Sequence, residues 1–148
     1  MKILLFFLVV FLIVVLYATI QNMITPQLGV KEGRLVSCPN TPRCVSSQSS
    51  RANQKVNPLP YHPAGIEVLA EIIETMPHAN IVTIDEVYLY AIFSSPIFGF
   101  KDDVEFFRND ETKQIDIRSA ARTGYYDLDV NRQRVEKIRS EFLKKLRF

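Results

Sequence analysis

Apolar residues fill almost every position near the start of the chain, before any alternating pattern begins. Residues 3–20 are apolar throughout, with Tyr17 and Thr19 as mild interruptions. A helix over this run spans roughly 27 Å at about 1.5 Å per residue, close to the ~30 Å hydrocarbon core of a bilayer. The pattern therefore predicts a transmembrane anchor over residues 1–20.

A cleaved signal peptide is the competing interpretation of this segment. Signal peptides carry about 7–15 apolar residues followed by a small-x-small cleavage site. Here the run is longer, and residues 17–22, Tyr-Ala-Thr-Ile-Gln-Asn, offer no good site of that kind. Lys2 on the short amino-terminal flank favours an amino end inside the cytoplasm. The sequence thus favours a single-pass protein of the inner (cytoplasmic) membrane, with its domain facing the periplasm or the exterior.

Residues 21–60 keep neither a helical nor a strand period for long. They contain a serine-rich polar run and several prolines, namely Pro26, Pro39, Pro42, Pro58 and Pro60. We predict an irregular lead-in that separates the domain from the bilayer and partly wraps it. The domain itself is expected over residues 61–148, continuous with part of the lead-in.

Two segments have the spacing of amphipathic helices. The first follows Pro63, which suits a first helical turn, and it ends at Pro77. Its apolar positions are Ile66, Leu69, Ala70, Ile73 and Met76. The second is expected over residues 130–146, with Asp127 or Asp129 as its cap. Its buried stripe is expected to be Val135, Ile138, Phe142 and Leu146.

Between the two helices the period changes to two, as in strands. Residues 81–84 and 87–94 are rich in β-branched and aromatic residues, and residues 103–108 and 114–119 are predicted to form a hairpin. One face of this hairpin is apolar, with Val104, Phe106, Ile115 and Ile117. The other is charged, with Asp103, Glu105, Asp116 and Arg118. This order indicates an α+β fold, a small antiparallel sheet of three to four strands with two helices on one face.

Charge and motifs exclude several classes of function. The chain after the anchor holds all 16 acidic residues against 17 of the 18 basic ones, a balance that argues against a general nucleic-acid binder. It has no glycine-rich phosphate loop, no G-x-S-x-G and no H-E-x-x-H. His62 and His78 lack the context of a catalytic triad. No cofactor is therefore expected.

Cys38 and Cys44 enclose a short segment with two prolines. In an exported domain a disulfide is the default interpretation of such a pair. A redox pair is the second reading, although the C-x-x-C spacing that lowers a thiol pKa is absent. A metal site is the third, but four ligands are not at hand and no metal is expected. We expect a disulfide that fixes the shape of a turn.

Charged residues are dense across residues 98–135, in a region otherwise apolar. The candidate binding residues are Asp102, Asp103, Glu105, Arg118, Ser119, Arg122, Asp127, Asn131 and Arg132. Acidic and arginine side chains are similar in number, which favours a structural ion-pair network. The carboxylates could instead hold a hard cation or include an acid–base pair. An anion is a further option at the start of the last helix, where free N–H groups favour negative charge, although Asp127 and Asp129 compete for it.

Three motifs in the chain resemble the bacterial domain of unknown function family 1499. They are SCPNTPRCVSSQ at residues 37–48, FGFKDDVEF at residues 98–106 and RSAARTGYYDLDVNRQRVEKIR at residues 118–139. Two departures are Arg43, where asparagine is usual before the cysteine, and Ala121, where serine is common. The resemblance implies an envelope-associated or exported protein and no established activity.

The function expected from these observations is binding or assembly in the cell envelope. Expected partners are the lipid bilayer, through the amino-terminal helix, and an anionic small ligand or an envelope protein. One alternative is an envelope hydrolase or cation-dependent enzyme that uses Asp102, Asp103 and Glu105, at least two of which would then face a cleft without an arginine partner. A binding pocket would instead expose Arg118 and Arg122. The other alternative is a purely structural charge network with no ligand.

Overall fold

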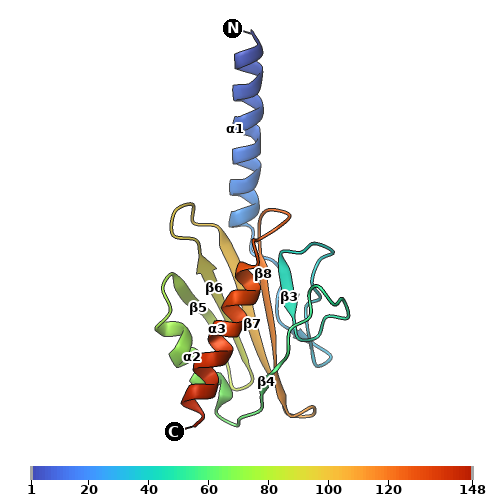
Figure 1. The fold of residues 1–148 in the computed structure, drawn as a ribbon, viewed down its shortest axis with the longest axis vertical. Helices are drawn as coiled ribbons and strands as arrows, with labels where there is room; N and C mark the ends of the chain where they lie inside the picture. The colour runs from blue at the N-terminus through green and yellow to red at the C-terminus, as the bar shows by residue number, and fades with distance from the viewer. Residues whose placement is uncertain (1, 148) are drawn as a thin grey trace.

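The structure is a computed structural model and describes residues 2–147. Its first element, α1 (Lys2–Met23), is a 22-residue helix with no buried residue. It stands away from the rest of the chain, which forms an α+β domain (Figure 1). By length and composition α1 can cross a membrane, and a signal sequence near the amino terminus would pass the same test.

The main sheet has six strands, more than the three to four predicted. They are β3 (Cys44–Ser46), β4 (Leu59–Pro60), β5 (Ala79–Ile84), β6 (Tyr88–Ser94), β7 (Lys101–Asn109) and β8 (Gln114–Ala121). The order is β3-β8-β7-β6-β5, β4 also pairs with β8, and every pairing is antiparallel. The prediction was wrong about the number because β3 and β4 are too short to display a period of two.

The lead-in also contains a separate two-stranded hairpin. Its strands are β1 (Val30–Lys31) and β2 (Arg34–Leu35). The two turn residues, Glu32 and Gly33, both have positive φ, at 51° and 70°. This is the pattern of a type I′ turn, whose twist suits a two-residue hairpin.

The helices α2 (Gly65–Glu74) and α3 (Val130–Lys145) lie on one face of the sheet (Figure 1). Pro63 precedes α2 instead of lying in its first turn, and the His62 carbonyl accepts a hydrogen bond from the Gly65 N–H. At Gly65 the helix comes so close to the sheet that an added Cβ would meet Ile115 Cδ1 at 2.4 Å.

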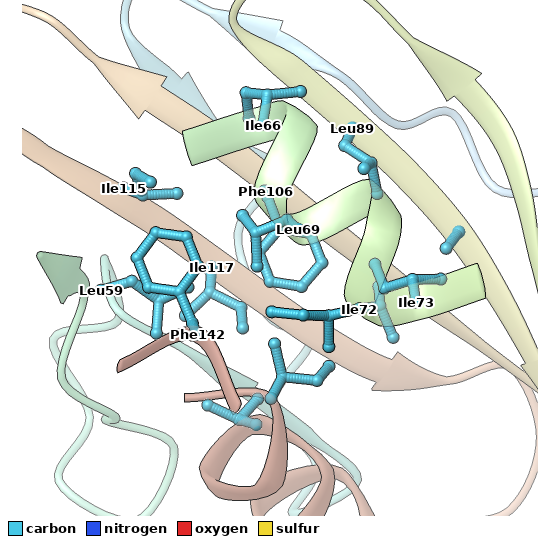
Figure 2. Packing of buried hydrophobic residues seen from close by; sticks show 14 of the residues in the cluster. Leu59, Ile66, Leu69, Ile72, Ile73, Leu89, Phe106, Ile115, Ile117 and Phe142 are labelled. Atoms are coloured by element: carbon cyan, nitrogen blue, oxygen red, sulfur yellow. The ribbon is translucent and has the colours of Figure 1, made fainter. Parts of the chain in front are cut away.

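The hydrophobic core fills the space between the two helices and the sheet. Figure 2 shows Leu69 of α2 and Phe142 of α3 packing toward Phe106, Ile115 and Ile117 of the sheet. All of these side chains are fully buried. The alternation predicted for the hairpin is confirmed, since its apolar positions all lie on this face.

The lead-in covers the opposite face of the sheet, which is polar. The backbone N–H of Gly29 donates to Glu105 Oε1 of β7 at 2.9 Å, and Ser47 Oγ donates to Asp116 Oδ1 of β8 at 2.7 Å. The domain therefore has three layers, with helices, sheet and lead-in in that order. The polar hairpin face lies between the second and third layers and is shielded from water.

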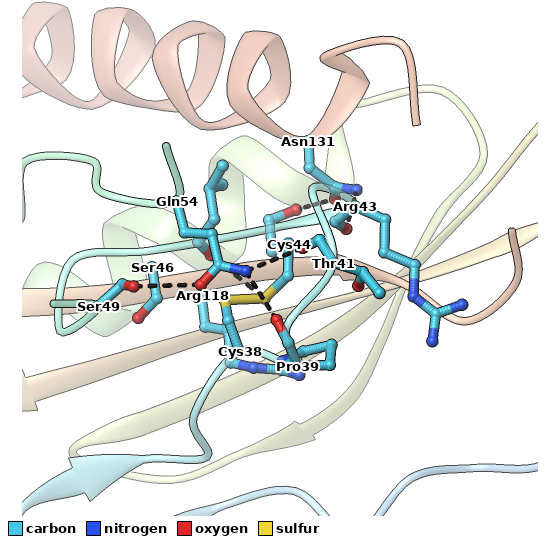
Figure 3. The surroundings of a disulfide bond; sticks show 12 residues. Cys38, Pro39, Thr41, Arg43, Cys44, Ser46, Ser49, Gln54, Arg118 and Asn131 are labelled. Atoms are coloured by element: carbon cyan, nitrogen blue, oxygen red, sulfur yellow. Dashed lines mark hydrogen bonds between the residues drawn. A yellow bond between two sulfur atoms is a disulfide. The ribbon is translucent and has the colours of Figure 1, made fainter. Parts of the chain in front are cut away.

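The predicted disulfide joins Cys38 to Cys44 at the edge of this third layer (Figure 3). The buried Gln54 amide donates hydrogen bonds to the carbonyls of Pro39 and Thr41, at 2.7 and 2.8 Å. Both carbonyls belong to the loop that the disulfide closes. The loop shape is thus held by a covalent bond and by a buried side chain from outside the loop.

Candidate functional site

Asp103 and Arg122 form a fully buried ion pair on the polar face of the sheet. Arg122 Nη2 lies 2.7 Å from Asp103 Oδ1, and Arg122 Nε donates to both carboxylate oxygens. The Tyr90 hydroxyl donates to the same carboxylate at 2.6 Å. Arg122 Nη1 also donates to the backbone carbonyl of Asn22, near the end of α1. This pair links β7 and the residue after β8 to the last turn of α1.

Glu105 and Arg118 form a second buried pair beside the first. Arg118 Nη1 donates to Glu105 Oε2 at 3.2 Å. The other oxygen of Glu105 accepts from the Tyr88 hydroxyl at 2.8 Å and from the Gly29 N–H. The carboxylate therefore has three donors, whereas Arg118 makes one side-chain hydrogen bond within the described residues.

Exclusion of water from this polar layer changes the pKa values of its side chains. Burial raises the pKa of the Tyr88 hydroxyl, and the adjacent Glu105 carboxylate adds to the effect. Burial likewise raises the pKa of Tyr90, together with its hydrogen bond to Asp103. The hydrogen bond to Asp103 raises the pKa of Arg122. Both tyrosines therefore remain neutral donors, and the arginine remains charged, at every ordinary pH.

Asp102 is separated from Asp103 and Glu105 because it points to the helix side of the sheet. Its Oδ2 lies 2.6 Å from Arg134 Nη2 of α3, and the Arg134 guanidinium stacks 4.7 Å from the Phe93 ring centre. Burial raises the pKa of Asp102, against the lowering effect of Arg134. The three carboxylates of the enzyme hypothesis thus do not share one cleft, and each has an arginine partner.

The start of α3 is closed by side chains of the protein itself. Asp127 Oδ2 accepts hydrogen bonds from the Asn131 N–H and side-chain amide, at 3.0 and 2.7 Å. Asn131 is fully buried, and its side-chain Oδ1 accepts hydrogen bonds from Ser119 Oγ and Arg134 Nη1. Arg132 points elsewhere and donates to carbonyls of the lead-in. The structure therefore does not gather Arg118, Arg122 and Arg132 around this helix end.

A cavity of about 230 Å³ lies between the lead-in and the polar sheet face. We call it the arginine cavity, and its lining is Gln21, Ile24, Pro26, Pro39, Arg43, Asp103, Arg118, Ala120, Ala121 and Arg122. Within residues 2–147, the Nε atoms of Arg43 and Arg118 are buried and lack any hydrogen-bond partner. Such buried donors are uncommon, because each has lost water without a replacement. Arg118 and Arg122 are buried but still border this space.

A second, larger cavity lies on the helix side of the sheet, at the end of the domain that adjoins the last turn of α1 (Figure 1). It has a volume of about 600 Å³ and a mostly apolar lining. Its wall includes Phe93, Pro96, Phe100, Tyr126, Leu128 and Val130, with the Asp102–Arg134 pair among them. We call it the apolar cavity.

Metal ligands do not cluster in the part of the chain that is described. Among residues 2–147 no group of three or more His, Cys, Asp or Glu side chains is placed to hold an ion. Asp116, the remaining carboxylate of the block, accepts from Ser47, Gln48 and Gln114. Its negative charge is therefore balanced by neutral donors and not by an arginine.

Sequence reasoning did not place several residues in the site. Arg43 was noted only as a departure from the family motif, and Tyr88 and Tyr90 were not among the candidates. A signal for the tyrosines was present, because both alternate with the apolar positions of β6. Arg43 had no such signal, since its place at the cavity depends on the fold of the lead-in.

An α+β domain with a buried polar layer and an amino-terminal apolar helix is the class that this geometry defines. The sequence profile described as Protein of unknown function (DUF1499) matches residues 34–142. The chain belongs to that family. No curated protein and no solved structure matches the chain.

Proposed function

We propose that the protein is a single-pass, membrane-anchored binding module of the cell envelope that takes up an anionic group in the arginine cavity. The ligand chemistry is a phosphate or a carboxylate, either free or carried on a lipid headgroup. The proposal depends on one observation, the buried guanidinium of Arg118 with its unpartnered Nε at the wall of the cavity.

The balance of donors and acceptors supports an anion. The carboxylates of Asp103 and Glu105 already accept several hydrogen bonds each, so they need no further cation. Arg118 and Arg43, in contrast, have buried donors to spare. A planar guanidinium binds oxyanions well, and a dry site strengthens the contact.

The anchor and the disulfide support the location. An apolar helix with Lys2 on its short flank favours a domain outside the cytoplasm. The Cys38–Cys44 bond is typical of oxidising compartments. Asn22, whose carbonyl accepts from Arg122, makes the end of α1 part of the fold, which favours retention of the helix. The inner membrane, with the domain toward the periplasm or exterior, follows as the proposed site.

Orientation is tested with single cysteines and a membrane-impermeant maleimide on intact cells. Lys113→Cys, in the exposed β7–β8 turn, is expected to react. Ile3→Cys, which leaves Lys2 in place on the short flank, is expected to react only after lysis. The reverse pattern would refute the orientation. Solubility without membrane association would refute the anchor.

Binding is tested by thermal unfolding of the full chain in nanodiscs of neutral lipid, at constant ionic strength. Inorganic phosphate and glycerol phosphate are one arm, and nanodiscs with phosphatidylglycerol are the other, which separates a free anion from a lipid headgroup. A ligand at one hundred times its Kd adds about 2.7 kcal/mol to stability. If the unfolding temperature does not change in either arm, the buried charges are explained as a purely structural network.

The matched variant is Glu105→Gln/Arg118→Met, which removes the cation without leaving a buried carboxylate unpaired. It is expected to lose the stabilisation by ligand. Arg132→Gln is the control, because Arg132 lies at the start of α3 and away from the arginine cavity. If only the Arg132→Gln control loses binding, the anion binds at the start of α3 and not in the arginine cavity.

A further inference from the structure

Large apolar side chains gather on two loops at one end of the domain. Residues 95–100 join β6 to β7, and residues 122–129 join β8 to α3. Ile97, Phe98 and Leu128 are 83%, 74% and 76% exposed. Such a concentration at adjoining loops is unusual for a surface that faces only water.

The backbone holds these side chains outward, so their exposure is not that of a loose chain. The Ser95 N–H donates to the Phe100 carbonyl at 2.8 Å, and the Phe100 N–H donates to Ser95 Oγ at 2.9 Å. In the other loop, Arg43 Nη1 donates to the Gly124 carbonyl at 2.7 Å. Both loops are therefore built to present apolar tips.

The first loop is fastened to the end of α1. Asn22 Nδ2 donates to the Gly99 carbonyl at 2.9 Å, and the Lys101 N–H donates to Asn22 Oδ1 at 2.6 Å. Asn22 follows Ile20, the last residue of the apolar run, by about 3 Å along the helix axis. Both loops lie at the end of the domain from which α1 leaves (Figure 1).

We propose that residues 95–100 and 122–129 form a docking face that rests in the interfacial layer of the bilayer spanned by α1. This inference uses the anchor of the proposed function, but it does not need the anion site. Because Asn22, in the last turn of α1, is bonded to Gly99 and Lys101, the end of the helix brings the loops to the level of the lipid headgroups. Exposed Tyr125 and Tyr126 add amphipathic rings of the kind enriched at that level.

Apolar insertion, and not attraction to anionic lipid, explains the contact. The loop 95–100 carries no charge. Asp127 and Asp129 of the other loop already have partners in α3, which limits the cost of bringing them to the membrane. The basic end of α3, with Lys144 and Lys145, lies at the opposite end of the domain (Figure 1). Neutral lipid is therefore sufficient.

When the docking face rests in the bilayer, lipid closes the opening of the apolar cavity. Phe100 and Leu128 belong both to the docking loops and to the cavity wall. Seating the loops in lipid removes the mouth of this cavity from water. The same contact restricts how far the domain can tilt about the end of α1.

The test uses the fact that the chain has no tryptophan. Phe98→Trp and Leu128→Trp each place one reporter on a docking loop of the full chain, in vesicles of neutral phosphatidylcholine. The vesicles carry bromine either near the carbonyls or near the ends of the acyl chains. Both reporters are expected to lose fluorescence, more to the shallow bromines than to the deep ones.

Two further variants separate docking from anchoring. Phe11→Trp, near the middle of α1, is expected to be quenched most by the deep bromines. Ile84→Trp is a matched control, because Ile84 is 50% exposed and lies at the far end of the β5–β6 hairpin from the docking loops. It is expected to keep its fluorescence.

Each outcome has one meaning. Quenching of both loop reporters, with the Ile84→Trp control unaffected, supports the docking face. Loop reporters that behave like the Ile84 control, while Phe11→Trp is quenched, overturn it and leave the anchor intact. Quenching of only one loop also overturns the two-loop face. No quenching of Phe11→Trp refutes the anchor instead.

Discussion

Replacing Asp103 by asparagine removes the negative charge from the most heavily bonded ion pair of the domain while keeping the side-chain shape. The side chains of Asp103 and Arg122 are each only 3% exposed, so water cannot replace the lost partner. An unpaired buried charge of this kind costs about 3–5 kcal/mol. Since small domains are stable by about 5–15 kcal/mol, Asp103→Asn is expected to lose a large part of the free energy of unfolding.

The assay is equilibrium unfolding of the full chain in mild detergent, followed by near-ultraviolet circular dichroism. Asp110→Asn is the control, because Asp110 pairs with Arg108 at 3.1 Å but is 49% exposed. Exposed pairs contribute less than about 1 kcal/mol. Asp103→Asn is therefore expected to lower the free energy of unfolding much more than Asp110→Asn does.

A double-mutant cycle isolates the pair. Adding Arg122→Met to Asp103→Asn removes the stranded cation, so the double variant is expected to cost less than the sum of the two single changes, by up to about 3 kcal/mol. Equal costs for the buried and exposed aspartates, together with additive behaviour in the cycle, would refute the idea that this layer is held by charge pairing.

Three further changes probe other parts of the fold, each by the free energy of unfolding. Reduction of Cys38–Cys44, with a separation of 6 residues, is expected to cost about 2 kcal/mol, and a Cys38→Ala/Cys44→Ala variant should show no response to reductant. Burial raises the folded-state pKa of Asp102, so wild type should gain stability relative to Asp102→Asn as pH falls through that pKa toward about 4; a difference that grows instead with rising pH would contradict this. Gly65→Ala should destabilise by about 1–3 kcal/mol despite its better helix propensity, because the new Cβ collides with Ile115, and a stabilised variant would refute the close approach.

The faces of the central hairpin could be predicted from sequence, since Val104 and Phe106 alternate with Asp103 and Glu105 and a strand allows no other arrangement. The partners of the charges could not. Asp102 and Asp103 are adjacent in sequence but lie on opposite sides of the sheet. Asp102 pairs with Arg134 of α3, whereas Asp103 pairs with Arg122, the residue that follows β8. Pairing depends on strand register and helix placement, which no local pattern records.

The strands of the lead-in could not be predicted from sequence either. They contain only two or three residues each, which is too short for an alternating pattern, and they lie in a proline-rich segment. Arg43 lies in the disulfide loop and Gln54 outside it, and both have their roles only because the folded lead-in brings them together (Figure 3). Nor could the docking loops be predicted from sequence, since no periodic pattern marks Tyr125 and Tyr126 as exposed residues.

The buried charges are connected to the end of α1 through one residue. Asn22 receives a hydrogen bond from Arg122, whose guanidinium is fixed by Asp103, and it also bridges Gly99 and Lys101. A hydrophobic layer of equal volume would stabilise the sheet as well or better, because buried ion pairs often add little net stability. It would not provide directional bonds to the end of α1. The polar layer is therefore better explained as a means of orienting the domain on its helix, which sets the height of the docking loops and the position of the arginine cavity beside the proposed bilayer.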